Sequence, residues 1–552
     1  MTAAGADLLV TGRIATLAGE AGPGWVEGVA VAGGRVVAAG SAADVEGLAG
    51  SNTRRLVLDP EDIAIPGLTD AHLHLAEAAL ARLRVNLDDA RSIGTILERA
   101  HAASVAVPDP GSWIEGAGWD ADLLERWPTA ADLERAAPGR LILLWAHDHH
   151  ALLVSVRALA EAGIDDGRGD PDGGVIRRDD AGHPTGVLHE TAARLVAGRV
   201  PAPSGERVAA ALRPLIRELV GLGLVAAHDP GGLSEQDDLT GPFEAYRALA
   251  AAVELGMRVH PCLRPEQLDA AEGQGLRSGQ PMGPDPLDRL RLGWLKTFAD
   301  GSLGSRTAAL LEPLEAIPGE PAPPNGGFGV WLVPPDELRV QATRAAALGI
   351  TTQIHGIGDA AVRVALDVLA PTVGRTALMP RVEHTQLVSD ADIPRFAALG
   401  IAASMQPVHV RSDAEKARRL WGPRAEARGY ALAAIASTGA LIPFGTDAPV
   451  EPVDPWPGIA CAVTRSAPSW PAGTPPFGPE NALDLWRAIR AACVDPALSA
   501  GETDRGRLVA GHRADMVVLP AAAVGEPVEV NGALWNARPS LVLMDGEVIA
   551  ER

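Results

Sequence analysis

Along most of the chain, stretches whose hydrophobic residues have helical spacing alternate with short runs of consecutive hydrophobic residues. Ala-rich stretches with helical spacing are each followed by a short apolar run, which is typical of parallel β/α units. The expected helices cover residues 92–106, 204–221, 244–254, 335–348, 360–369 and 390–398. The expected strands cover residues 63–75, 222–228, 258–263, 290–296, 351–355, 381–384, 401–405 and 440–444. Eight strands in this alternation predict an α/β fold built on a (β/α)8 TIM-like barrel.

The two ends of the chain follow a different pattern of short strands. Apolar runs at 8–10, 13–17, 29–32 and 35–39 include a hairpin signal at Gly33-Gly34. Similar runs return at 514–519, 540–544 and 547–550. We therefore predict that residues 1–62 and 508–552 form one small β-sandwich domain, which flanks a catalytic barrel of residues 63–507.

Residues 109–221 interrupt the β/α alternation after the first barrel strand. They are rich in Gly, Pro and Asp, notably at 167–174, and carry Trp113, Trp119 and Trp127. We interpret this segment as an inserted lid or substrate subdomain, whose tryptophans supply apolar area for a substituent of the substrate.

Composition narrows the classes of partner. The 552-residue chain has a formal net charge of −22, which argues against nucleic acid and anionic membranes and favours a small-molecule substrate. No signal-peptide pattern and no membrane-length apolar run is present, so we expect a cytoplasmic protein. Three widely spaced cysteines indicate neither a disulfide framework nor a thiolate zinc site, so a metal must use nitrogen and oxygen ligands. Whether the chain forms a homodimer stays open.

The segment Pro66-Gly-Leu-Thr-Asp-Ala-His-Leu-His74 places Asp70, His72 and His74 at alternate positions, on one face of the expected first strand. Two imidazoles on one face at a strand end are suited to a zinc-like ion. Two histidines that are each satisfied by a hydrogen bond would explain the motif equally well when it is taken alone.

Lys296 stands out because only two of the 48 basic residues are lysines. A lysine kept in an apolar strand suggests chemistry that arginine cannot perform, since a buried amine can lose its proton and a guanidinium does not. An ion pair with Asp300 is the structural alternative. Further polar residues follow the expected barrel strands, and the carboxyl ends of such strands meet at one site, so we expect these to converge: His72, His74, Lys296, His355, His384 and Asp447.

These motifs together resemble the amidohydrolase superfamily, in particular the family-3 branch that includes N-substituted formamide deformylase-like proteins. The resemblance extends over nearly the whole chain. It rests on 66–74, 113–120, 296–308 (Lys-Thr-Phe-Ala-Asp-Gly-Ser-Leu-Gly-Ser-Arg-Thr-Ala), 355–359, 381–386 (Arg-Val-Glu-His-Thr-Gln), 405–407, 445–449 (Gly-Thr-Asp-Ala-Pro) and 511–518.

The resemblance implies a set of metal ligands around one or two divalent ions, with zinc expected. It implies that His72, His74 and Asp447 hold one ion, that His355 and His384 hold a second, and that Lys296, carboxylated by carbon dioxide, bridges them. A metal-bound hydroxide would attack a carbonyl carbon, and Asp447 would carry the proton to the leaving nitrogen. A structural Asp447 that caps the turn after Thr446 also fits the local sequence.

Residues outside this set are candidates for contacts with the substrate. The family has a histidine over the substrate at the position of His150, which would either polarise the substrate or belong to the lid. This chain departs from the family at Ser155, where an asparagine is usual. Trp119, Asp120 and Gln406 are pocket candidates, with core packing and a turn cap as the alternatives.

The sequence therefore predicts a metal-dependent hydrolase that cleaves a C–N bond of an acyclic amide, N-acyl or N-formyl compound. Hydrolysis of a cyclic amide, an imine, an ester or a lactone at the same site is the enzymatic alternative. A non-catalytic metal-binding barrel scaffold is the alternative outside enzymes, and such a scaffold would be expected to have lost ligands. The expected ligand set is complete here.

Overall fold

The structure is a computed structural model that describes residues 5–19, 21–107, 109–146, 151–171, 174–231, 239–316, 324–525, 527–530 and 532–552. The chain divides into two compact units, one formed by Met1–Ala78 with Val208–Arg552 and the other by Ala79–Arg207. Among the described residues, no helix is both long and apolar enough to cross a membrane.

Parallel strands of the larger unit form the barrel. One sheet has the order β14-β13-β6, and a second has the order β15-β16-β17-β18. Their bounds are β6 Leu68–Asp70, β13 Leu224–Asp229, β14 Arg258–Pro261, β15 Leu295–Phe298, β16 Thr352–Gly356, β17 Arg381–His384 and β18 Ala402–Ser404. Most of these residues are buried, as expected for parallel strands that are covered on both faces.

Single bridges and hydrogen bonds close the ring. A parallel bridge between Leu263 and Leu295 joins the two sheets, and another between Met405 and Phe444 adds the last strand-like segment. The Ala71 amide then donates to the Phe444 carbonyl at 2.8 Å, which returns the ring to its first strand. The described segments therefore follow the expected barrel order, although the eighth is too irregular to form a ladder of its own.

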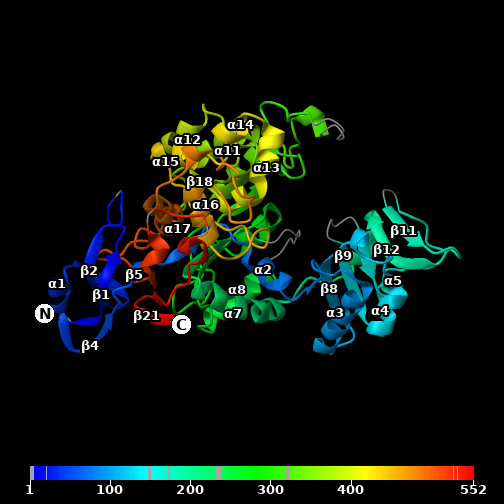
Figure 1. Ribbon diagram of the computed structural model, residues 1–552, viewed down its shortest axis with the longest axis horizontal. Helices are drawn as coiled ribbons and strands as arrows, with labels where there is room; N and C mark the ends of the chain where they lie inside the picture. The colour runs from blue at the N-terminus through cyan, green and yellow to red at the C-terminus, as the bar shows by residue number, and fades with distance from the viewer. Residues whose placement is uncertain are drawn as a thin grey trace. The chain divides into compact units, whose positions relative to one another are not determined.

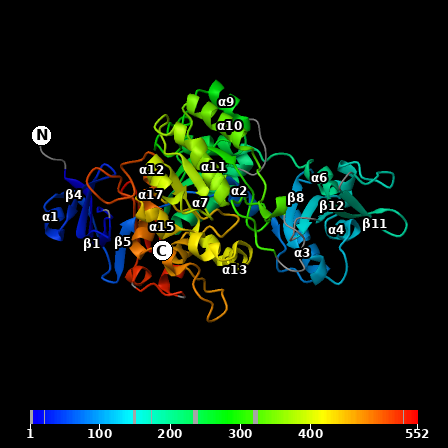
Figure 2. The same ribbon diagram turned by 90° about the horizontal axis from the view of Figure 1, so that it is seen from above.

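Apart from the first, which packs on the N-terminal strands, the helices of the larger unit alternate with these strands and surround them (Figures 1 and 2). Those expected at 204–221, 244–254, 335–348, 360–369 and 390–398 occur close to the expected bounds. In chain order the helices are α1 Ala42–Glu46, α2 Leu75–Ala81, α7 Gly205–Gly221, α8 Pro242–Ala251, α9 Leu268–Gly273, α10 Pro335–Ala347, α11 Asp359–Leu369, α12 Ile393–Leu399, α13 Val410–Trp421, α14 Arg424–Arg428, α15 Leu432–Ser437, α16 Trp456–Thr464 and α17 Leu485–Ser499.

Strands from both ends of the chain lie in one further sheet. In the described residues its order is β21-β20-β19-β5-β1-β2-β3, with β4 paired to β1. Gly33 and Gly34 both adopt positive φ in the β2–β3 hairpin, as that turn requires. The bounds are β1 Ala6–Ala15, β2 Trp25–Ala32, β3 Arg35–Gly40, β4 Ala49–Val57, β5 Asp62–Pro66, β19 Met516–Pro520, β20 Leu541–Met544 and β21 Glu547–Glu551. A second sheet, which a sandwich would need, stays a prediction.

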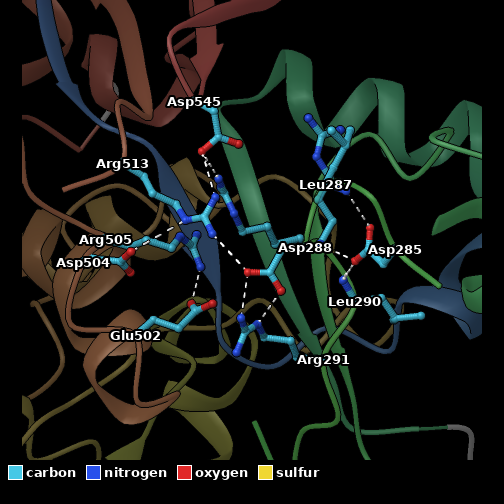
Figure 3. Close-up of polar contacts among 12 residues, drawn as sticks. Asp285, Leu287, Asp288, Leu290, Arg291, Glu502, Asp504, Arg505, Arg513 and Asp545 are labelled. Atoms are coloured by element: carbon cyan, nitrogen blue, oxygen red, sulfur yellow. Dashed lines mark hydrogen bonds and ion pairs between the residues drawn. The ribbon is translucent and has the colours of Figure 1, made fainter. Parts of the chain in front are cut away.

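An ionic cluster ties this sheet to the barrel (Figure 3). Arg258, at the start of β14, contacts Asp515 at 2.9 Å and Asp545 at 2.6 Å. Arg513 contacts Asp545 and Asp288, each at 3.1 Å. Because Arg258 begins its strand, the cluster lies at the amino ends of the barrel strands, the end that supports stability in this fold.

The second unit is a six-stranded sheet of order β11-β12-β10-β9-β8-β7 in the described residues. The side chains of α3 and α4 contribute to one apolar cluster, and those of α5 and α6 contribute to another. The bounds are β7 Val85–Asn86, β8 Trp113–Trp119, β9 Leu141–Ala146, β10 Ala151–Val154, β11 Gly174–Arg178, β12 Pro184–Glu190, α3 Ile93–Ala106, α4 Ala130–Ala136, α5 Val156–Glu161 and α6 Thr191–Ala197.

Two boundaries differ from the sequence interpretation. The expected first strand at 63–75 is divided, because β5 pairs in the composite sheet, β6 pairs in the barrel, and α2 begins at Leu75. The second unit spans 79–207 rather than 109–221. The expected helix at 92–106 belongs to it, since Ile96 of α3 packs with Ile114 of β8. An amphipathic helix has the same pattern of apolar positions whichever sheet it packs against. The pattern therefore could not show that this helix belongs to the second unit rather than to the barrel.

Candidate metal centre

His72 lies two residues beyond the end of β6 and is fully buried. Its Nδ1 is 2.5 Å from Oε2 of Glu383 on β17. Its Nε2 lies 3.5 Å from Asp447 Oδ1 and 3.5 Å from Lys296 Nζ. A neutral imidazole that donates from Nδ1 to a carboxylate keeps its lone pair on Nε2. His72 can therefore offer Nε2 as a ligand to an ion bound beside Asp447 and Lys296.

His74 is oriented in the same way by a backbone carbonyl. Its Nδ1 is 2.6 Å from the Gly231 carbonyl oxygen, and its Nε2 is 3.5 Å from Asp447 Oδ1. Gly231 is itself held by Asp229, whose Oδ1 accepts from the Gly231 amide at 2.9 Å. Both histidines therefore point Nε2 at the same carboxylate.

Asp447 links these two histidines to a third, His409. It follows the last barrel segment, its amide donates to the His72 carbonyl at 2.7 Å, and its Oδ2 is 3.2 Å from Nε2 of His409. Burial by itself would raise the pKa of Asp447, but hydrogen bonds from His409 and His74 hold that pKa well below its usual range. The carboxylate is thus ionised and able to act as a ligand.

His384 and His355 complete the set of neighbouring imidazoles. His384 Nδ1 is 2.9 Å from Gln406 Oε1, and its ring lies 4.4 Å from that of His355. His355 Nε2 is 3.0 Å from the Gly301 carbonyl, while its buried Nδ1 has no hydrogen-bond partner. Burial lowers the pKa of His355 to about 3, which keeps the ring neutral at physiological pH.

Backbone geometry at two barrel segments serves this cluster. His384, Thr385 and Asp447 have φ of 72°, 46° and 60°, in the left-handed region that residues other than glycine seldom adopt. In a regular strand Glu383 and His384 would point to opposite faces. The turn of the backbone at His384 brings both side chains toward the cluster, Glu383 to His72 and His384 to Gln406.

Lys296 is fully buried on β15, beside His72. Burial lowers the pKa of its amine to about 8, although Glu383 and Asp447 act to raise it. A larger fraction of the amine is therefore neutral near pH 7 than in an exposed lysine. Asp300, the alternative partner, instead accepts three backbone amide hydrogens, from Ala309, Ile357 and Gly358.

The donor set fits a divalent ion. Within the described residues, two groups have ligand atoms within 4.8 Å of one another: His72, His74 and Asp447, and His384, His409 and Asp447. Two ligands about 2.1 Å from one tetrahedral zinc lie roughly 3.4 Å apart, close to the separations of His72 and His74 from Asp447. Burial lowers the pKa of His72 to about 4 and that of His384 well below its usual range, so these rings are neutral ligands. Burial alone would also lower the pKa of His74 and His409, but hydrogen bonds to Asp447 raise both, that of His409 to about 10, so these two rings must release a proton to bind an ion.

A family model described as "Amidohydrolase family" matches residues 62–550. The chain belongs to this family. The match includes the barrel, the second unit, the strands from β19 onward and all the histidines of the metal centre. Family membership therefore supports hydrolysis at a metal site.

Individual relatives agree with this assignment. The protein YtcJ of Bacillus subtilis (strain 168) is 31% identical over 494 residues, which are 89% of each chain. The N-substituted formamide deformylase of Arthrobacter pascens is 27% identical, over 95% of each chain. Among solved structures, an uncharacterized metal-dependent hydrolase from Pyrococcus furiosus matches with 26% identity and a TM-score of 0.76, over 95% of this chain and all of the other.

The remaining sequence-derived candidates fall in different places. Gln406 contacts His384, as described above. Trp119 is fully buried in the second unit, and its indole donates to the Leu144 carbonyl at 2.8 Å. These contacts match the core-packing alternative for Trp119. Asp120 is half-buried directly after β8, and His150 lies outside the described residues.

Sequence reasoning did not single out Glu383 or His409. Glu383 was noted only as part of a motif, because strand alternation places it opposite His384. His409 ends the short helical turn Pro407–His409 just beyond β18. Its position past a barrel strand is the same signal that identified the other histidines, but His409 lies five residues beyond the end of β18 at Ser404, farther than any of them lies from its strand.

Proposed function

We propose that this chain hydrolyses the C–N bond of a small acyclic amide, with an N-acyl or N-formyl compound as substrate. The observation that carries the proposal is the buried group of His72, His74 and Asp447 at the carboxyl ends of barrel strands, where this fold places its active sites. The similarity to an N-substituted formamide deformylase supports the choice of bond.

The residues of the site have separable roles in this proposal. A divalent ion held there would supply a Lewis acid and a water that ionises near neutral pH. Asp447 holds its carboxylate in the ionised form and accepts the proton of the attacking water, then returns it to the leaving nitrogen. His409, 3.2 Å from Asp447 Oδ2, fixes the orientation of that carboxylate.

We also propose that Lys296 is carboxylated on Nζ by carbon dioxide and bridges two ions, of which His355 and His384 hold the second. Its buried position and the lowered pKa of its amine support this modification, because only the neutral amine reacts with carbon dioxide. The new N–C bond releases a proton and replaces a cation by an anion with two oxygen ligands. An unmodified ammonium beside His72 would instead repel a metal ion.

Substrate selectivity is proposed to come from the second unit, which carries His150, Trp119 and Asp120, and from Gln406 in the barrel. Because Trp119 is packed in the core of that unit, its contribution would be to shape the unit rather than to touch the substituent.

The test is a panel of acyclic N-substituted formamides and N-acyl amines, with cyclic amides, imines, esters and lactones as the competing classes. Turnover is measured after zinc loading, after removal of metal by a chelator, and after zinc is returned. We expect turnover of acyclic amides that is lost on chelation and recovered with zinc. Turnover of lactones alone, or turnover that survives metal removal, would contradict the proposal.

A pair of histidine variants controls for non-specific effects. His72→Gln should lose zinc and activity. His183→Gln changes an exposed histidine, which pairs with the exposed Asp166 at 2.8 Å, and should leave both unchanged.

A further inference from the structure

Arg381 lies beneath the metal centre, on the same strand as Glu383 and His384. It is fully buried in the barrel interior, where its guanidinium stacks 3.9 Å from the ring centroid of Trp294. A buried arginine needs several acceptors, because its five N–H groups leave water on folding. The contacts that it makes lead directly to His72.

Two of these contacts reach His72 from different sides. Arg381 Nε forms an ion pair with Oε1 of Glu383 at 2.9 Å, without the geometry of a hydrogen bond, and the other oxygen of Glu383 is the partner of His72 Nδ1. Arg381 Nη2 donates to the carbonyl of Ala71, the residue that precedes His72, at 3.1 Å. One guanidinium therefore fixes both the side-chain partner of His72 and the backbone that carries it.

Other contacts hold the guanidinium itself in place. Nη2 also donates to Gln353 Oε1 on β16 at 2.6 Å, and Nη1 is 3.0 Å from Nδ1 of His228 on β13. The two carboxylate oxygens of Glu383 face different partners, Oε1 the Arg381 guanidinium and Oε2 the His72 imidazole. The planar guanidinium makes these contacts at once, which a lysine amine could not do.

We propose that Arg381 and Glu383 are positioning residues that act as one unit to orient His72 and to strengthen its binding of the metal. This inference rests on the proposed metal site, but it concerns ion binding rather than the bond cleaved. An anionic acceptor on Nδ1 makes Nε2 a better ligand, and a fixed ring loses less entropy when it binds.

A purely structural Arg381 is the rival explanation, since any buried arginine that loses its partners is destabilising. Arg465 provides a matched control. It is also fully buried, and its guanidinium donates to the backbone carbonyls of Phe477 and Gly429 rather than to a candidate ligand.

The experiment measures zinc affinity of the full-length, metal-depleted protein by competition with a chelating dye, together with the visible spectrum of the Co²⁺ form. Arg381→Met and Glu383→Gln should each weaken zinc binding about 10- to 100-fold and alter the cobalt spectrum. Arg465→Met should lower the melting temperature but leave zinc affinity and the cobalt spectrum unchanged.

The double variant Arg381→Met/Glu383→Gln tests whether the two residues act together. Its zinc affinity should equal that of whichever single variant binds zinc less tightly, because both changes act through the His72 imidazole. Fold-changes that multiply would overturn the proposal. Wild-type affinity in both single variants, or an equal loss in Arg465→Met, would also overturn it.

Gln353→Met covers the case in which Arg381→Met does not fold. This variant keeps the Arg381 guanidinium and nearly the same side-chain volume at position 353, but it removes one acceptor of that guanidinium. We expect a smaller loss of zinc affinity than in Arg381→Met. An unchanged zinc affinity would count against the proposal. Failure of the amide panel would leave these results intact, because zinc affinity is measured without any substrate.

Discussion

At the scale of single residues, Lys296 offers the clearest test of chemistry, because a charge-preserving substitution separates its two explanations. If Lys296 is a carboxylated bridge, Lys296→Arg should be inactive and bind less than the normal complement of metal, since a guanidinium cannot become a carbamate. Lys296→Ala should regain part of its activity with metal and a short carboxylic acid, whose oxygens can occupy the bridging position. Activity and elemental metal content are measured together.

Lys416 is the natural control for this experiment, because it is the other lysine and lies exposed on α13. Lys416→Arg should keep wild-type activity and metal content. Near-normal activity and metal in Lys296→Arg would remove the carbamate from the site and leave Lys296 as an ordinary buried amine.

At the scale of elements, the first and last barrel segments lie so close together at Gly445 that this position has no room for a side chain. A Cβ built on Gly445 would lie 2.5 Å from the His72 amide nitrogen and 2.6 Å from the His72 Cβ. Gly445→Ala should therefore push apart the two segments that carry His72 and Asp447. We expect a loss of roughly 1–3 kcal/mol in the free energy of unfolding and a marked fall in zinc affinity. Thermal unfolding and zinc titration measure the two effects.

Gly273 serves as the comparison for this substitution. It is the last residue of α9, and a Cβ there meets open space at a φ that alanine tolerates. Gly273→Ala should leave zinc affinity unchanged and should not lower stability, because alanine reduces the freedom of the unfolded chain. If Gly445→Ala behaves in the same way, the spacing of the two segments does not control the metal centre.

At the scale of the whole molecule, the apolar core of the composite sheet draws on both ends of the chain. Val518 of β19 is buried in it together with Leu8, Val10 and Ile14 of β1. Val518→Asp places an unpaired charge in this core and should give insoluble or strongly destabilised protein, as should removal of residues 508–552. Val548→Asp, at a position that is 47% exposed on β21, should remain soluble. A soluble, fully active truncation would show that the two ends do not depend on one core.

The sequence by itself determined the features that are local. Residue type and period along the chain predicted the barrel strands and most of its helices, and they identified His72, His74, His355, His384 and Asp447 at strand ends. The Gly33-Gly34 hairpin follows from two residues that tolerate positive φ. These features need only a few neighbouring positions, so one sequence is enough to find them.

Only the tertiary structure decided which distant groups meet. Glu383 is 311 residues from its partner His72, and neither side chain carries a signal for the other. The positive φ of His384 reverses the alternation that would separate it from Glu383. Arg381 acquires its place from His228 on β13, Gln353 on β16 and the carbonyl of Ala71 just after β6. The helix at 93–106 could pack on either sheet. Such choices depend on the free energy of packing the whole chain, which no local period records.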